Sequence, residues 1–112
     1  MSISTHVLDA LRGRPAAGVP VRLDRATSEH RWQRVGETVT GRDGRVREQF
    51  EMPLEAGEYR LVFDTAVYFA AAGIDEFFFP EVVICFRIAD PAEHYHVPLL
   101  LGPFSYSTYR GS

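Results

Sequence analysis

Residues 82–101 read VVICFRIADPAEHYHVPLLL, and this stretch decides the fold class. Its first part, residues 82–88, places an apolar side chain at every second position, which is typical of a β-strand with one buried face. Asp90-Pro91 then supplies a turn signal, and a second strand is expected from His94 to Leu101. The stretch therefore predicts two consecutive strands joined by a short turn.

The same period-two pattern recurs along the rest of the chain. Further strands are expected at residues 3–8, 19–23, 31–40, 45–50, 59–63 and 106–110. Asp43-Gly44 supplies the positive φ that a tight hairpin requires. Alanines between Thr65 and Gly73 favour one short helix, which Thr65 can cap and Gly73 can end. About eight strands and one helix predict a mainly β protein, a two-layer antiparallel β-sandwich in one domain spanning residues 1–112.

Composition and charge disfavour several classes of protein. Of the 112 residues, 46% are hydrophobic and 24% charged, a globular balance, and the net charge of -3 argues against a nucleic-acid partner. No apolar run approaches the ~20 residues that span a bilayer, and the N-terminal residues do not resemble a secretory signal. Cys85, the single cysteine, is interpreted as a small buried hydrophobe in a reducing compartment. We expect a cytoplasmic protein that binds no membrane.

Three features bear side chains suited to chemistry. In a strand His94 and His96 face the same side, so both imidazoles can point into one cavity. His6 also lies on a strand, and the ending YSTYRGS carries aromatics, hydroxyls and an arginine where most domains end in a frayed polar tail.

Each feature also has a plainer interpretation. The His-x-His pair can simply form a polar outer face of a sheet, or three histidines can hold a catalytic zinc with one open position. Arg45 beside a turn and His30 in a polar loop are, by default, solvated surface residues. From the residues alone these alternatives stay open.

Several segments resemble the defining motifs of 5-hydroxyisourate hydrolases, which belong to the transthyretin-like family. They are EHYHVPLLL (93–101), YSTYRGS (106–112), STHVLD (4–9), GRPA (13–16), DGR (43–45), YR (59–60) and FFPE (78–81). The resemblance runs in order from Ile3 to Ser112, and the terminal YRGS together with HYHVP is its most specific part.

This resemblance implies a fold, an assembly and a reaction. The fold is that of transthyretin, and the assembly is a homotetramer, a dimer of dimers with active sites in the channel between the dimers. The reaction converts the purine-derived substrate 5-hydroxyisourate to 2-oxo-4-hydroxy-4-carboxy-5-ureidoimidazoline without a cofactor or a metal. The implied catalytic residues are His6, Arg45, His96 and Ser112, and the implied substrate-binding residues are Tyr109, Arg110, Gly111 and His94.

The chemistry fits these residue types. Water must attack a ring amide, and a histidine can remove its proton near neutral pH. Arg45 can stabilise the oxyanion because its guanidinium stays protonated. The sequence leaves open whether His6 or His96 is the base, and whether Ser112 acts through its hydroxyl or a terminal carboxylate. No Gly-x-Ser-x-Gly motif suggests a nucleophilic serine.

Two other functions compete with this hypothesis. A transthyretin-like carrier would bind small hydrophobic ligands in the same channel, but a carrier favours an apolar channel rather than histidines and arginine. A plain immunoglobulin-like interaction module would leave the terminal motif unexplained.

Overall fold

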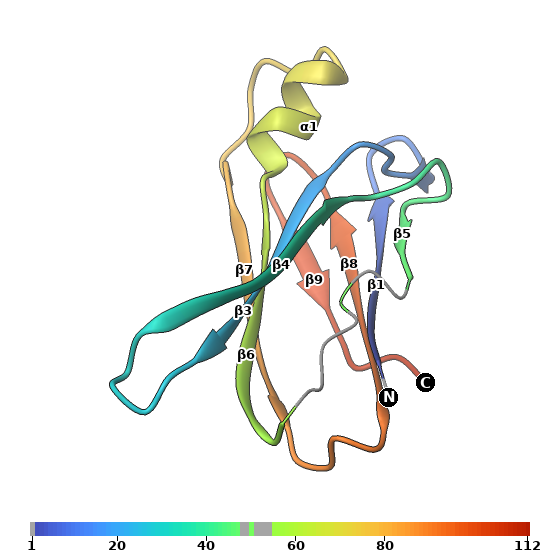
Figure 1. The fold of residues 1–112 in the computed structure, drawn as a ribbon. Coiled ribbons are helices and arrows are strands. Elements are labelled where there is room, and N and C mark those ends of the chain that lie inside the picture. Colours follow the sequence, from blue (N-terminus) through green and yellow to red (C-terminus); the bar gives the residue numbers. More distant parts are fainter. Residues whose placement is uncertain (1, 48–49, 51–54) are drawn as a thin grey trace.

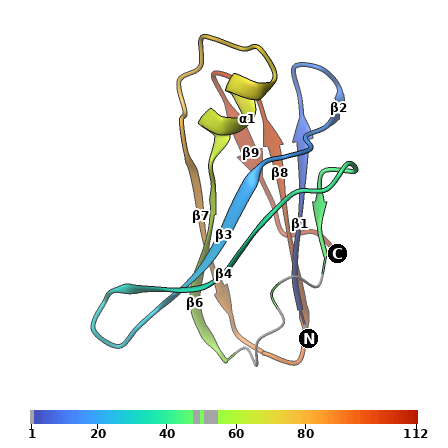
Figure 2. The same ribbon diagram turned by 45° about the horizontal axis from the view of Figure 1, so that its top comes forward.

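The computed structural model describes residues 2–47, 50 and 55–112, which form two β-sheets and one short helix (Figure 1). The strands are β1 (Ser2–Asp9), β2 (Arg14–Pro15), β3 (Pro20–Ala26), β4 (Trp32–Val39), β5 (Arg45–Val46), β6 (Gly57–Phe63), β7 (Val82–Ile88), β8 (His94–Leu101) and β9 (Tyr106–Thr108). Helix α1 (Thr65–Ala71) connects β6 to the segment before β7 and lies at one end of the sandwich (Figures 1 and 2).

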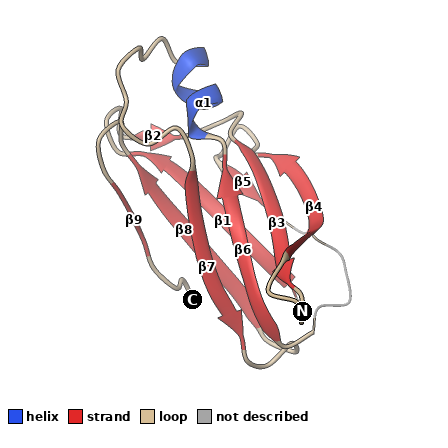
Figure 3. Cartoon of the chain, turned by 90° about the vertical axis from the view of Figure 1, so that its left-hand side faces the viewer, coloured by secondary structure: helices blue, strands red, loops and turns tan. Residues whose placement is uncertain are grey.

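The two sheets are built from different numbers of strands. The first sheet has the order β2-β1-β8-β9, and β5 pairs with the side of β1 that β8 leaves open. The second sheet has the order β4-β3-β6-β7. Figure 3 shows the strands of both layers running along the length of the molecule. The predicted two-layer, mainly β fold with one short helix is confirmed.

One strand pair departs from the antiparallel arrangement. β1 and β8 are parallel, and their register runs from Ser2 opposite His94 to Asp9 opposite Leu101. All other named strand pairs are antiparallel. Alternation of apolar side chains reports which face is buried but not the direction of a neighbouring strand, so the sequence pattern did not predict this pair.

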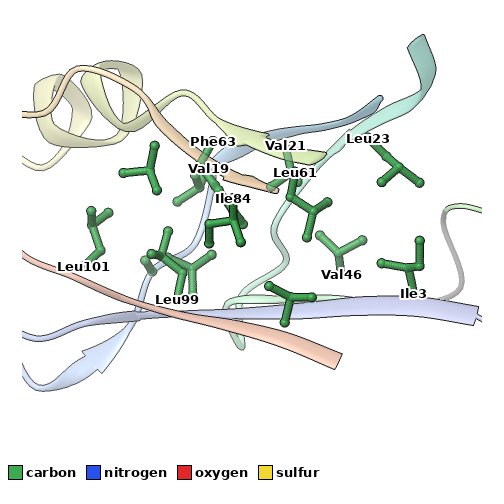
Figure 4. Packing of buried hydrophobic residues seen from close by; sticks show 14 of the residues in the cluster. Ile3, Val19, Val21, Leu23, Val46, Leu61, Phe63, Ile84, Leu99 and Leu101 are labelled. Atoms are coloured by element: carbon green, nitrogen blue, oxygen red, sulfur yellow. The ribbon is translucent and has the colours of Figure 1, made fainter. Parts of the chain in front are cut away.

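Alternating side chains of the two sheets meet between the layers. In β1, Ile3, Thr5 and Val7 are buried, whereas Ser4 and His6 lie on the opposite, half-buried face. Figure 4 shows how the aliphatic and aromatic side chains of both sheets pack. The largest fully buried side chains include Tyr59, Phe63, Phe69, Ile3, Leu23, Leu61, Ile88, Leu99 and Leu101. Each such burial contributes about 1.5–3 kcal/mol, so this core holds β1 and β8 rigidly in place.

The start of helix α1 differs from the prediction. Asp64 caps the helix, because its Oδ1 accepts a hydrogen bond from the backbone N–H of Val67 at 3.2 Å. Thr65 is the first helical residue and is fully buried, and its hydroxyl donates to the carbonyl of Phe79. Thr65 is therefore not the cap. Gly73, with φ of 75°, follows the helix as expected.

Two expected strands are shorter than predicted. β5 ends at Val46, and the expected strand residues Glu48 and Gln49 lie outside the described part of the chain. β9 ends at Thr108, so Arg110 is not in a strand. The turn before β5 requires Gly44, which has φ of 76° and whose Cβ would lie 2.4 Å from the carbonyl oxygen of Val7.

The interpretation of Cys85 as a buried residue is wrong. Its thiol is exposed, because Val82, Ile84 and Ile88 of β7 point into the core and Cys85 alternates to the other face. In the described residues, no helix is long and apolar enough to cross a membrane.

Candidate active site

The polar residues of β1, β5 and β8 meet on the outer face of the first sheet. The parallel register places Ser4 beside His96, and the antiparallel pairing of β5 places Arg45 beside His6. Neighbouring strands lie about 4.8 Å apart, so side chains that share this face contact one another. Four residues from three distant parts of the sequence thereby form one patch.

Ser4 connects the two histidines of β8. Its Oγ lies 3.0 Å from Nε2 of His94 and 2.7 Å from Nδ1 of His96. The two imidazole rings are nearly parallel, at 15°, with 6.5 Å between their centroids. The prediction that both histidines face the same side is confirmed. Sequence reasoning did not single out Ser4, although alternation placed it on the face of His6, because its contact with His96 depends on the register of β1 and β8.

The C-terminal segment returns to this patch after β9. Gly111 forms a bridge with His96, and its N–H donates to the carbonyl of His96 at 2.8 Å. A Cβ at Gly111 would lie only 2.5 Å from Cδ2 of His96. Gly111 does not have a positive φ, so the glycine is required for close approach to the ring rather than for an unusual backbone conformation.

A cavity of about 320 Å³ opens beside these residues. Its described lining consists of Ser4, Thr5, Arg45, Val46, Arg47, His94, His96 and Ser112. Three of the four predicted catalytic residues therefore share one cavity. His6, the fourth, is not part of this lining and lies next to Arg45.

Hydrogen bonding fixes the orientation of His6. Its Nε2 lies 3.0 Å from the backbone carbonyl of Asp43. A carbonyl only accepts hydrogen bonds, so Nε2 carries the proton, and Nδ1 is the basic nitrogen of the neutral ring.

The surroundings favour neutral imidazoles. Burial lowers the pKa of His96, and the neighbouring Arg45, His94 and His6 lower it further, while a hydrogen bond with the Ser4 backbone opposes them. Burial and then Arg45 also lower the pKa of His6, against opposing contributions from Asp43. Both pKa values therefore lie below the usual value of a histidine, and both rings can accept a proton at neutral pH.

Arg45 keeps its charge available. Its backbone N–H donates to Oδ1 of Asp43 at 3.0 Å, and the other oxygen of that carboxylate binds Arg47 at 3.0 Å. Among the described residues no carboxylate forms an ion pair with the Arg45 guanidinium. An arginine of this kind at a cavity can stabilise an anion that forms there.

A family model described as the HIUase/Transthyretin family matches residues 3–111. The chain belongs to this family. A 5-hydroxyisourate hydrolase of Deinococcus radiodurans is 46% identical over 98% of this chain and 95% of its own length. The structure of Klebsiella pneumoniae 5-hydroxyisourate hydrolase matches with a TM-score of 0.85 and 41% identity, covering 98% of each chain. Sea bream transthyretin in complex with thyroxine matches with a TM-score of 0.89 and 32% identity, covering 97% of this chain and 93% of that one.

In this member of the HIUase/Transthyretin family, Tyr109 and Arg110 line a second cavity. It measures about 360 Å³ and is also lined by Cys85, Tyr95 and His96. The Arg110 guanidinium binds Glu93 at 2.9 Å and lies 4.7 Å above the ring of Tyr95. These contacts anchor the tail against β8. A direct contact of Tyr109 or Arg110 with substrate stays a prediction.

The described residues of this family member include no group of three or more His, Cys, Asp and Glu side chains that could hold a metal ion. A reaction without metal stays a prediction, which dialysis against a chelator can check. His30 is exposed in the β3–β4 loop, as expected for a surface residue.

Proposed function

We propose that this chain hydrolyses 5-hydroxyisourate to 2-oxo-4-hydroxy-4-carboxy-5-ureidoimidazoline. Several relatives that are 42–46% identical over 98% of the chain carry the name 5-hydroxyisourate hydrolase. The observation that carries the proposal is the meeting of His96, Arg45 and Ser112 in one cavity. These residues come from β8, β5 and the tail, and they are three of the four residues that the motif resemblance marks as catalytic.

The base in this mechanism is His96. Water is a poor nucleophile at neutral pH, so a neutral imidazole must take its proton as it attacks the ring carbonyl. His96 lines the cavity, whereas His6 lies beside Arg45, and its Nε2–H donates a hydrogen bond to the backbone carbonyl of Asp43. Ser4 binds Nδ1 of His96 on one side of the ring and Gly111 packs against Cδ2 on the other. The Nε2 edge is therefore the edge directed toward substrate.

Arg45 and Ser112 complete the reaction site. The guanidinium of Arg45 stabilises the oxyanion of the tetrahedral intermediate, and removal of one such donor typically costs ~10²–10³-fold in rate. Ser112, which lines the same cavity, orients the substrate. The proton taken from water returns to the ring nitrogen as the cyclic amide bond breaks, which completes the hydrolysis.

A hydrophobic-ligand carrier is the alternative function. Sea bream transthyretin is described in complex with thyroxine and has the same fold, so the fold alone does not separate a carrier from an enzyme. The lining of the cavity favours the enzyme over the carrier. Among the described residues that line it, Val46 alone is apolar, and the rest are hydroxyls, imidazoles and guanidiniums. Such a lining suits a polar purine derivative better than a hydrophobic ligand.

Fresh 5-hydroxyisourate decays on its own, and its ultraviolet absorbance reports the rate. We expect the purified protein to accelerate this decay in proportion to its concentration. An unchanged decay, together with saturable binding of thyroxine by the same sample, would assign the chain to the carriers instead.

The proposed assembly is a homotetramer, a dimer of dimers. The described surface carries large exposed apolar side chains, including Leu11, Phe78, Phe104 and Tyr109, and the sheets end in open edge strands such as β7 and β9. Association commonly covers such surfaces. Sedimentation at micromolar protein should give four copies, and a fully active monomer would contradict both the assembly and a site shared between dimers.

A further inference from the structure

The hydroxyl of Ser4 lies between two ring nitrogens. Its Oγ is 3.0 Å from Nε2 of His94 and 2.7 Å from Nδ1 of His96. A hydroxyl donates one hydrogen bond and accepts others, so it links the two rings in one of two directions. Either His96 donates to Ser4 and Ser4 donates to His94, or both hydrogen bonds are reversed.

The proposed reaction requires the first direction. The base at the cavity is Nε2 of His96, so the proton of the neutral ring belongs on Nδ1. Nε2 is then unprotonated and free to act as the base, and the Ser4 hydroxyl donates its hydrogen to Nε2 of His94.

We propose that Ser4 and His94 form a proton relay that moves the positive charge gained by His96 to the surface of the molecule. The proposal rests on the proposed hydrolase function and adds two residues to its machinery. His94 is exposed, whereas His96 is partly buried. Neither Ser4 nor His94 needs to touch the reacting atoms, so both are positioning residues.

The relay conserves every proton. As water attacks the ring carbonyl, Nε2 of His96 takes one proton from it. The Nδ1 proton of His96 then passes to Oγ of Ser4, and the hydroxyl proton of Ser4 passes to Nε2 of His94. His96 is again neutral, now protonated on Nε2, and His94 is an imidazolium. When His96 gives its Nε2 proton to the leaving ring nitrogen, the two transfers reverse and restore all three groups.

Electrostatics explains why the charge should leave His96. Arg45 and His6 lie near His96, and a second cation beside the Arg45 guanidinium is unfavourable. His94 lies two residues before His96 in β8, opposite Ser2, whereas Arg45 lies opposite His6. The relay therefore moves the charge about 6.6 Å along the strand, away from Arg45 and into water.

The first test compares Ser4→Ala with Ser4→Thr as the matched control. Ser4→Ala removes the hydroxyl and should lower kcat about tenfold or more with KM within threefold of the wild-type value. Ser4→Thr keeps the hydroxyl and should restore kcat to within threefold. Equal loss in both variants, or none in Ser4→Ala, would overturn the relay. Circular dichroism and melting of each variant establish that it is folded.

The second test uses His94→Gln, an exposed substitution that keeps hydrogen bonding but cannot carry a proton. It should lower kcat about as much as Ser4→Ala, and adding it to Ser4→Ala should cost nothing more. In mixtures of H₂O and D₂O, the wild-type rate should depend on deuterium content as a multi-proton step, and either variant should give a one-proton dependence. A raised KM with unchanged kcat would instead make His94 a substrate contact.

The relay and the proposed function fail separately. If the wild-type protein does not accelerate the decay of 5-hydroxyisourate, the hydrolase proposal fails and the relay with it. If the wild-type protein does so and folded Ser4→Ala and His94→Gln match its kcat, the relay alone is wrong.

Discussion

The outer faces of the two sheets both carry charged side chains, but they use them differently. On the second sheet, Asp24 binds Arg22 at 3.0 Å and Arg60 at 2.8 Å, and Arg60 lies 4.4 Å above the ring of Trp32. Burial raises the pKa of Asp24, but the hydrogen bonds from Arg22 and Arg60 outweigh it and hold the pKa below its usual value. Every charge in this cluster has a partner.

On the first sheet, Arg45 differs from this cluster. It has no carboxylate ion-pair partner among the described residues, and burial and Arg45 itself lower the pKa values of the neighbouring His6 and His96. A cluster whose charges are paired has little left to offer a ligand, whereas an unpaired cation beside neutral bases can act on one. This difference, more than the fold, separates a structural cluster from a reaction site.

The largest effect should come from the base. His96→Asn keeps a polar side chain but cannot take a proton from water, and loss of a general base typically costs ~10²–10⁴-fold in rate. The decay of 5-hydroxyisourate should approach its spontaneous rate while the melting temperature stays near that of the wild type. A rate within threefold of wild type would refute the role of His96.

Arg45→Gln removes the Arg45 charge and should change both kcat/KM and its pH dependence. Loss of oxyanion stabilisation should lower kcat/KM by ~10²–10³-fold. Arg45 lowers the pKa of His96, and His94 and His6 act in the same direction, so removing Arg45 should raise that pKa. Activity needs the neutral imidazole and is lost as pH falls through its pKa, so the acid limb of kcat/KM should move to higher pH. A limb that stays in place would contradict this electrostatic coupling.

Gly111→Ala, beside the same sheet, should lower kcat by a smaller factor. The added Cβ would lie 2.5 Å from Cδ2 of His96 and must push the ring or the tail aside. We expect kcat to fall at least tenfold, about 1.4 kcal/mol of transition-state stabilisation, without unfolding of the core. Ala71→Gly, on the exposed side of helix α1, is a control for a small change elsewhere. A wild-type kcat in the folded Gly111→Ala variant would show that the C-terminal tail does not contribute to the site.

The paired cluster should respond in stability rather than activity. Asp24→Asn removes the charge that binds Arg22 and Arg60, and hydrogen bonds to charged groups contribute about 1.5–3 kcal/mol each. The melting temperature should fall by several degrees, and kcat should stay within twofold of wild type. A large loss of kcat in a protein of unchanged stability would erase the distinction between the two faces.

Much of the fold was predictable because its signals are local. Alternation in residues 82–88 and 94–101 matches β7 and β8, and Gly73 ends the helix where expected. The cap was misassigned because Asp64 and Thr65 are both good caps, and only the burial of Thr65 and its hydrogen bond to the Phe79 carbonyl separate them. Cys85 was misassigned because an apolar run does not reveal which of its alternating residues face outward.

The candidate site divides in the same way. By itself the sequence determined most of the strands and the same-face pair His94 and His96, since each depends on neighbours in the chain, whereas Arg45 and Ser112 were marked only by the family resemblance. Only the tertiary structure decided that Ser4 binds His96, a contact between residues 92 positions apart. It also decided that position 111 must lack a side chain to fit against the His96 ring. The first contact follows from the parallel register of β1 and β8, and the second from the bridge between His96 and Gly111 in the tail; no local pattern encodes either of them.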